Sequence, residues 1–297
     1  MKKNWVLYAM VTVLLWGIWG SLAGLSAERG FPDTLVYVVW SLTMIPPALF
    51  VLARSGWKLD ASPAAIGYGM AIGLLGAGGQ MLLFKALTLG PSYFVFPIIS
   101  LSPAITIALS YLLLRERTGK LGALGIVLAL VALPLFDLSL GQGAAGQGLG
   151  WFALALLIMA AWGVQAYFMK LANNTVSAES IFFYMMVGGL ALAPVAWFMT
   201  DFTQPINLGW DGPWMTAGIQ ILNAIGALTI VYAFRHGKAM VVAPLTNAGA
   251  PLVTAVLGLI FAGVMPGQLR IVGLVFALIA SVLLVLEPER PAAESRP

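Results

Sequence analysis

Ten long apolar runs are the feature that most constrains how this chain can fold. Each holds about 20 residues, the length that an α-helix needs to cross the ~30 Å hydrocarbon core of a bilayer. Of the 297 residues 61% are hydrophobic and 9% charged, whereas a soluble domain carries about 25% charged residues. The runs are continuous rather than alternating, which excludes a β-barrel. We therefore predict an all-α integral membrane fold with spans near residues 5–24, 33–53, 64–88, 91–114, 119–138, 149–171, 177–199, 213–234, 239–263 and 267–286.

The basic residues between the runs predict the orientation. With a cytoplasmic N-terminus, twelve Lys and Arg fall inside, and only Arg29, Lys85 and Arg270 fall outside. This asymmetry is the one expected from the positive-inside rule, and it explains the pI of about 9.4 without nucleic acid. The first run lacks a clear cleavage site, so we read it as a retained span. Both termini are then cytoplasmic, most simply at a bacterial inner membrane.

Short sequence blocks recur at a nearly constant offset. Trp16-Gly17 matches Trp162-Gly163, and two further blocks match in the same order. These are Ala86, Gly90 and Pro97 with Ala233, Gly237 and Pro244, and Gly119, Leu121 and Gly125 with Gly267, Leu269 and Gly273. The chain therefore divides into a first five-span unit at 1–144 and a second at 145–288. A polar tail at 289–297 has no apolar periodicity and is expected to be disordered in the cytoplasm.

An odd number of spans in each unit has a topological consequence. The second unit must enter the membrane upside down relative to the first. Inverted repeats of this kind recur in secondary transporters, in which the two halves exchange conformations around a central site. The repeat therefore predicts transport by alternating access.

One stretch of the first unit and one of the second carry a family resemblance. Residues 86–133 read ALTLGPSYFVFPIISLSPAITIALSYLLLRERTGKLGALGIVLALVAL: a small-residue turn, a proline inside the fourth span, a Leu-x-Glu-Arg element and a Gly-rich fifth span. The segment GKAMVVAPLTNAGAPLVTAVLGLIFAGVMPGQLRIVGLVFALIA repeats the pattern. The chain thus resembles the drug/metabolite transporter superfamily in its ten-span EamA-type branch. The second copy departs from that branch at one place, because Val264 stands where Glu116 stands in the first copy.

The acidic residues argue against one coupling mechanism. All eleven fall in loops, at span ends or in the tail. No carboxylate is therefore expected in mid-membrane as a proton relay or counter-ion. Facilitated movement or exchange is favoured instead.

Lys85 lies within the third predicted span, a turn or two from its outer end. One interpretation is a snorkelling lysine, with its stem on apolar surface and its ammonium among headgroups. The other is an anchor for a carboxylate or phosphate on the substrate. The sequence leaves both open.

Tryptophans and amides supply the remaining candidate binding residues. Trp lying deep in a span departs from its usual interfacial place, and an amide in hydrocarbon needs a partner or a watery cavity. Each could instead join helices only. A cavity with such walls suits a small polar metabolite such as a sugar or an amino acid, or a quaternary amine. The candidate substrate-binding residues are Trp16, Trp19, Gln80, Lys85, Trp162, Gln165, Asn223 and Asn247.

Prolines inside the fourth and ninth spans are candidate hinges. Each removes a backbone donor and tends to kink its helix. Interrupted helices at matching places in two halves point to a binding site in transporters, although ordinary membrane helices also contain proline. The four residues are Pro97, Pro103, Pro244 and Pro251.

Other functional classes are less well supported by the sequence. The chain has no cysteine and a single histidine, His236, and it shows neither zinc spacing nor a phosphate-binding glycine loop. We therefore expect no enzyme, cofactor or metal site. A channel, receptor or scaffold is an alternative, as is an exporter of amphipathic or quaternary amines. The expected partners are a small-molecule substrate and the bilayer, with no nucleic acid, for a monomer or weak homodimer.

Overall fold

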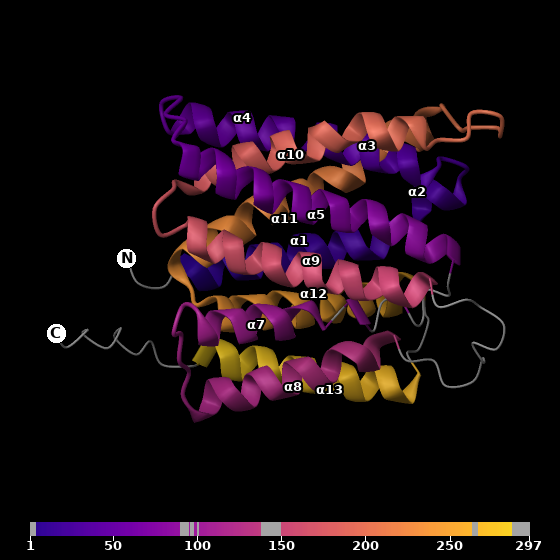
Figure 1. Cartoon of the computed structure of the whole chain (residues 1–297). Helices are drawn as coiled ribbons and strands as arrows, with labels where there is room; N and C mark the ends of the chain where they lie inside the picture. The colour runs from indigo at the N-terminus through magenta and orange to yellow at the C-terminus, as the bar shows by residue number, and fades with distance from the viewer. Residues whose placement is uncertain are drawn as a thin grey trace.

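The computed structural model describes residues 4–89, 95, 98–99, 101–137, 150–262 and 267–286. Within these ranges the regular elements are all helices, packed side by side along one direction (Figure 1). We call the end of the bundle at which α1 begins and α13 ends the proximal end, and the opposite end the distal end. The first half contains α1 (Asn4–Leu22), α2 (Leu25–Glu28), α3 (Asp33–Thr43), α4 (Ile45–Arg54), α5 (Pro63–Leu89), α7 (Ser102–Leu112) and α8 (Lys120–Asp137).

The second half begins at α9. It contains α9 (Gly150–Ala172), α10 (Ala178–Phe198), a π-helical turn η1 (Trp210–Trp214), α11 (Met215–His236), α12 (Ala239–Ala262) and α13 (Gln268–Leu286). Among the residues that the structure describes, six helices are long and apolar enough to cross a membrane, and four shorter apolar helices accompany them. The predicted all-helical membrane fold is confirmed, and the count of ten spans stays a prediction.

The predicted span 33–53 is interrupted in the structure. The helices α3 and α4 meet at Met44, which is fully buried, and Pro46 and Pro47 follow at the start of α4. Two consecutive prolines remove two backbone donors, so the carbonyls of the preceding turn lose their helical partners. The span therefore consists of two helical segments, which the sequence analysis did not predict.

The main contacts between the halves occur in matching pairs. Helix α1 packs against α11 and α12, and α9 packs against α5 and α7. At the first pair of crossings, Trp16 Nε1 donates to the Asn223 carbonyl and Trp162 Nε1 donates to the Gly76 carbonyl, both at 3.2 Å. The two bonds lie at positions related by the offset of the sequence repeat.

The second pair of crossings repeats another bond. Thr254 Oγ1 donates to the Gly17 carbonyl at 2.8 Å, and Thr106 Oγ1 donates to the Gly163 carbonyl at 3.0 Å. Threonine hydroxyls therefore join α12 to α1 and α7 to α9 in the same way.

Glycine makes the closest of these approaches possible. A Cβ built on Gly73 of α5 would lie 2.9 Å from the Met185 carbonyl oxygen, and one built on Gly188 of α10 would lie 2.9 Å from the Gly73 backbone. Because backbone stands against backbone here, neither partner has a flexible side chain that can move aside. The α5–α10 interface thus depends on both glycines.

We expect Gly73→Ala to destabilise the protein by about 1–3 kcal/mol, because the added methyl group overpacks this interface. Gly78→Ala on the same helix is the matched control, since nothing lies within 4 Å of a Cβ there. Thermal unfolding of both variants in nanodiscs measures the difference. Equal melting temperatures would contradict the packing role.

Candidate functional site

Polar side chains of α1, α3 and α11 meet in the interior of the bundle. Asn223 of α11 accepts a hydrogen bond from Trp40 Nε1 on its side-chain Oδ1, at 2.8 Å, and one from Trp16 on its backbone carbonyl. Trp19 Nε1 donates to Gln220 Oε1 at 3.0 Å. All three tryptophans and Asn223 are half-buried. These five residues form what we call the tryptophan–amide cluster.

Helical spacing explains why the cluster forms. Trp16 and Trp19 are three residues apart, as are Gln220 and Asn223, so each pair lies on one helix face. The two faces oppose each other because α1 packs along α11. Asn223 Nδ2 makes no hydrogen bond within the described residues, which leaves its two N–H donors for another partner.

The matching crossing of α5 and α9 holds the counterpart residues. Trp162 bonds the Gly76 carbonyl, and Gln165 Nε2 donates to the Ile72 carbonyl at 3.1 Å. Gly76 and Gly79 of α5 leave room for these side chains. Four of the predicted residues, Trp16, Trp19, Trp162 and Gln165, thus lie at helix crossings, and their role in ligand contact stays a prediction.

Gln80 differs from the other amides. It is half-buried on α5, and its side chain makes no hydrogen bond in the described part of the chain. Its position on the helix lies between that of Gly76, which faces α9, and that of Ala77, which packs beside Tyr37. The amide therefore lies on the side of α5 that faces the interior of the bundle, with no hydrogen-bond partner among the described residues.

The other predicted residues are more scattered. Asn247 is half-buried on α12 and donates from Nδ2 to the Ala243 carbonyl of its own helix at 2.9 Å. Lys85 is exposed near the end of α5, at the distal end of the bundle. The structure does not place either residue in the tryptophan–amide cluster.

The four candidate hinge prolines have different surroundings. Pro103 is buried in the first turn of α7, and Pro244 is buried inside α12. Pro251 also lies within α12, where the backbone is helical. Pro97 lies outside the described residues.

Two members of the cluster, Trp40 and Gln220, are not among the residues predicted from the sequence. Trp40 lies deep in the second predicted span, and Gln220 is an amide in the eighth. The rules that selected Trp16 and Asn223, mid-span tryptophan and intramembrane amide, would have selected both.

A line of polar and aromatic contacts runs from the cluster to the proximal end, between α1 and α11. Thr12 Oγ1 lies 2.8 Å from Thr229 Oγ1. Further along, the rings of Tyr8 and Tyr232 stack with centroids 5.1 Å apart. Because polar groups in a membrane interior need partners, these contacts satisfy side-chain hydroxyl groups between α1 and α11, and we call this line of contacts the seam.

The proximal end is fastened by the loop after α7. Arg115 takes a left-handed conformation (φ 55°), which costs about 1–2 kcal/mol in a non-glycine residue. This turn brings the Glu116 carboxylate to the start of α12, where its oxygens accept the N–H groups of Ala239 at 3.2 Å and Met240 at 3.1 Å. A carboxylate of one half thereby caps a helix of the other half. Val264, at the matching position of the second copy, lies outside the described residues.

A second proximal contact joins the loop before α5 to α10. The Asp60 backbone N–H donates to Ser180 Oγ, and Tyr184 Oη donates to the Asp60 carbonyl, both at 3.0 Å. Hydrogen bonds from Ser62 hold the pKa of the Asp60 carboxyl below its ordinary value. The side chain is therefore ionised at neutral pH.

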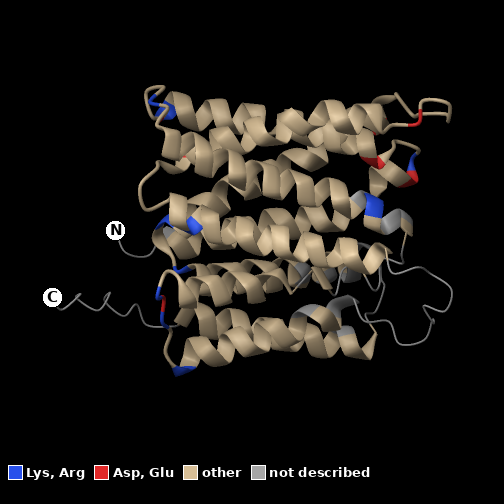
Figure 2. Cartoon of the chain, viewed as in Figure 1, with Lys and Arg blue, Asp and Glu red and all other residues tan. Residues whose placement is uncertain are grey.

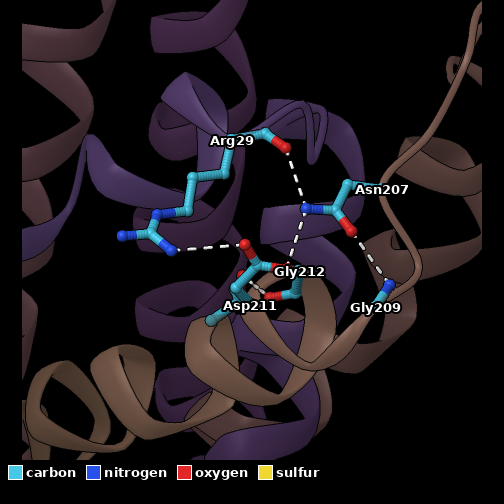
Figure 3. Close-up of polar contacts among 6 residues, drawn as sticks. Arg29, Asn207, Gly209, Asp211 and Gly212 are labelled. Carbon is cyan, nitrogen blue, oxygen red and sulfur yellow. Dashed lines mark hydrogen bonds and ion pairs between the residues drawn. The ribbon is translucent and has the colours of Figure 1, made fainter.

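At the distal end an ion pair joins the halves (Figure 3). Arg29 Nη1 lies 3.2 Å from Asp211 Oδ2, with both side chains about half exposed. Asn207 Nδ2 donates to the Arg29 carbonyl at 2.9 Å and to Asp211 Oδ1 at 3.1 Å. The loop after α2 is thus tied to the loop before α11, so in this structure both ends of the bundle carry contacts between the halves.

A sequence model described as the EamA-like transporter family matches residues 3–136 and 149–286. The chain belongs to this family. The resemblance seen in the sequence is thereby confirmed, and the family consists of membrane transporters rather than enzymes. The two matched segments cover the two halves of this EamA-like protein separately.

Two curated relatives are each 25% identical to part of this EamA-like chain. The uncharacterized protein MJ1333.1 of Methanocaldococcus jannaschii aligns over 134 residues, which is 45% of this chain and 96% of that protein. Protein LicB of Haemophilus influenzae aligns over 139 residues, 42% of this chain and 46% of LicB. The match therefore spans about half of LicB.

A solved crystal structure shares the fold. It superposes with a TM-score of 0.81 over 96% of this chain and 99% of its own, at 18% sequence identity. At that identity the likeness concerns the fold alone.

The bond between Trp40 and Asn223 can be measured by a double-mutant cycle. We expect Trp40→Phe and Asn223→Ala to show a coupling of about 0.5–1.5 kcal/mol, the range found for hydrogen bonds between membrane helices. Unfolding of the two single variants and the double variant in mixed micelles gives the value. Strictly additive effects would show that the bond does not stabilise the α3–α11 contact.

We expect Glu116→Gln to destabilise the protein by about 1 kcal/mol, because a neutral amide caps a helix N-terminus less well than a carboxylate. Glu28→Gln is the control: Glu28 is exposed and makes no side-chain hydrogen bond within the described residues. The melting temperatures of both variants in nanodiscs measure this loss of stability. A control that loses as much stability as Glu116→Gln would rule out the cap.

Proposed function

We propose that this protein is a secondary transporter that moves a small polar metabolite by alternating access between two inverted halves of five spans each. The observation that carries the proposal is the paired set of crossings: α1 on α11 and α12, and α9 on α5 and α7, joined by matching bonds. Figure 1 supports the inversion, since α1 begins at the proximal end and α9 at the distal end.

Such an arrangement suits alternating access for a physical reason. Two halves with equivalent crossings in opposite orientations can adopt each other's conformations, which moves the opening of a central site from one side to the other. The contacts at the two ends differ in chemistry: a carboxylate cap at the proximal end, and an exposed ion pair at the distal end. Their relative strengths would set which side opens more readily.

The charge distribution supports a cytoplasmic proximal end (Figure 2). Of the eleven Lys and Arg within the described residues, eight lie at that end and three at the distal end. We infer from the positive-inside rule that both termini are cytoplasmic, in a bacterial inner membrane.

The substrate we propose is a sugar, an amino acid or a similar small molecule. Within the described helices, the amides and tryptophans of the interior provide neutral donors, acceptors and ring faces, and carboxylates occur only near helix ends. This argues for facilitated movement or exchange rather than for a carboxylate proton relay. Export of an amphipathic or quaternary amine is the second candidate, favoured by Trp16, Trp19 and Trp40 in one cluster.

The transport proposal predicts saturable counterflow in proteoliposomes for a substrate first found by thermal-shift screening of sugars, amino acids, amines and nucleosides. We expect Gln80→Ala to raise the substrate KM roughly tenfold, the effect of losing one or two hydrogen bonds. Gln268→Ala, an exposed glutamine at the start of α13, is the matched control.

One result would contradict the transport proposal, and another would contradict the role of Gln80. Single-channel currents without counterflow would indicate a channel. Counterflow that Gln80→Ala and Gln268→Ala leave equally unchanged would support a transporter but remove Gln80 from its binding site.

A further inference from the structure

A cavity of about 490 Å³ opens at the proximal end of the bundle, away from the tryptophan–amide cluster. Four helices of both halves form its walls: the start of α1, the end of α4, the start of α10 and the end of α11. Its chemically distinctive lining residues are Tyr8, Phe50, Arg54, Glu179 and Tyr232. None of them belongs to the tryptophan–amide cluster, although Tyr8 and Tyr232 also end the seam, and we call this space the proximal cavity.

One wall of the proximal cavity combines aromatic rings with a carboxylate. Tyr8 and Tyr232 stack with an interplanar angle of 21°. Tyr232 Oη donates to Glu179 Oε1 at 2.6 Å, which fixes the carboxylate beside the ring pair. Oε2 of Glu179 accepts no hydrogen bond within the described residues. A carboxylate oxygen beside tyrosine rings is a favourable environment for a cationic nitrogen.

The α4 wall carries the opposite charge. The Arg54 guanidinium lies 5.9 Å from the centroid of the Phe50 ring and makes no hydrogen bond to other described residues. Its planar set of donors suits a carboxylate or phosphate group.

The two charges line the same cavity without neutralising each other. Among the described residues the ion pair within 4.0 Å is Arg29–Asp211, and Arg54 and Glu179 do not form one. Opposite charges that face a shared space with free donors and acceptors are complementary to a molecule that carries both charges itself.

We propose that the proximal cavity binds a zwitterion, with its cationic nitrogen at Glu179, Tyr8 and Tyr232 and its anionic group at Arg54. This inference does not depend on the proposed transport role. The same chemistry exists in a free amino acid or betaine and in a zwitterionic phospholipid headgroup. The second source is physically reasonable because Phe50 is 62% exposed at the helix end, where headgroups lie.

The cavity also lies at the end of the seam between α1 and α11. Tyr8 and Tyr232 are one helical turn from Thr12 and Thr229, which lead toward Trp16 and Asn223. A zwitterion held here would therefore lie at the proximal end of the seam, whose other end is the tryptophan–amide cluster.

Binding of three probes to the purified full-length protein tests the proposal: glycine betaine with both charges, tetramethylammonium with the positive charge alone, and acetate with the negative charge alone. Isothermal titration in lipid-free detergent gives each affinity. We expect glycine betaine to bind more tightly than either of the other two probes.

Two substitutions should then give a crossed pattern. Glu179→Gln keeps the size of the side chain and a hydrogen-bond acceptor for Tyr232, and should weaken betaine and tetramethylammonium roughly tenfold while sparing acetate. Arg54→Gln should weaken betaine and acetate to a similar extent and spare tetramethylammonium. Asp201→Asn and Lys58→Gln, two exposed residues outside the cavity lining, are charge-matched controls and should change nothing.

Measurements in two lipids distinguish a lipid headgroup from a free zwitterion as the bound molecule. If a headgroup occupies the proximal cavity, betaine should bind more weakly in phosphatidylcholine nanodiscs than in phosphatidylglycerol nanodiscs, because the choline headgroup competes. Equal affinities indicate a free zwitterion.

The proposal is overturned if betaine does not bind, or if both cavity variants bind all probes as well as the controls do. The melting temperature of each variant without ligand shows whether it is folded, so that a lost affinity is not mistaken for a lost fold.

Discussion

The two halves are held together by hydrogen bonds from one half to the backbone of the other. A bilayer offers no water to a buried N–H or C=O group, so polar atoms in the spans must find partners within the protein. Trp16 and Trp162 meet this requirement on a helix of the opposite half, and Thr254 and Thr106 do the same. Glycines at the crossings let these helices approach closely, and the tryptophan–amide cluster lies where α1 and α11 meet.

Much of this architecture could be predicted from the sequence, because in a membrane hydropathy and charge are strong constraints. The apolar runs predicted the helices. The Trp-Gly repeat predicted that α1 and α9 correspond to each other, and the crossings of these two helices match. The hydrogen-bond partners of the polar side chains were harder to predict. Whether Asn223 bonds Trp40 or a ligand depends on the rotation of α3 and α11, and a continuously apolar helix carries almost no periodicity that would fix its rotation.

Two further features needed the three-dimensional structure for different reasons. The target of Glu116 is the start of α12, more than a hundred residues away, and no local pattern indicates such a contact. The proximal cavity combines residues of four helices, each of which is unremarkable alone: Arg54 at a span end reads as an ordinary basic flank, and Glu179 as an acid in a first turn. Only because Arg54 and Glu179 line the same cavity do their two charges together suit a zwitterion.

The break at Met44 has a mechanical consequence. Pro46 and Pro47 interrupt the backbone ladder between α3 and α4, and bending at such a point costs less than bending a continuous helix. Trp40 lies on the α3 side of the break, bonded to Asn223, whereas Phe50 and Arg54 lie on the α4 side. The break therefore separates two tasks within one span: α3 contributes Trp40 to the tryptophan–amide cluster, while α4, whose Ala48 and Val51 are buried in the core, contributes Phe50 and Arg54 to the proximal cavity.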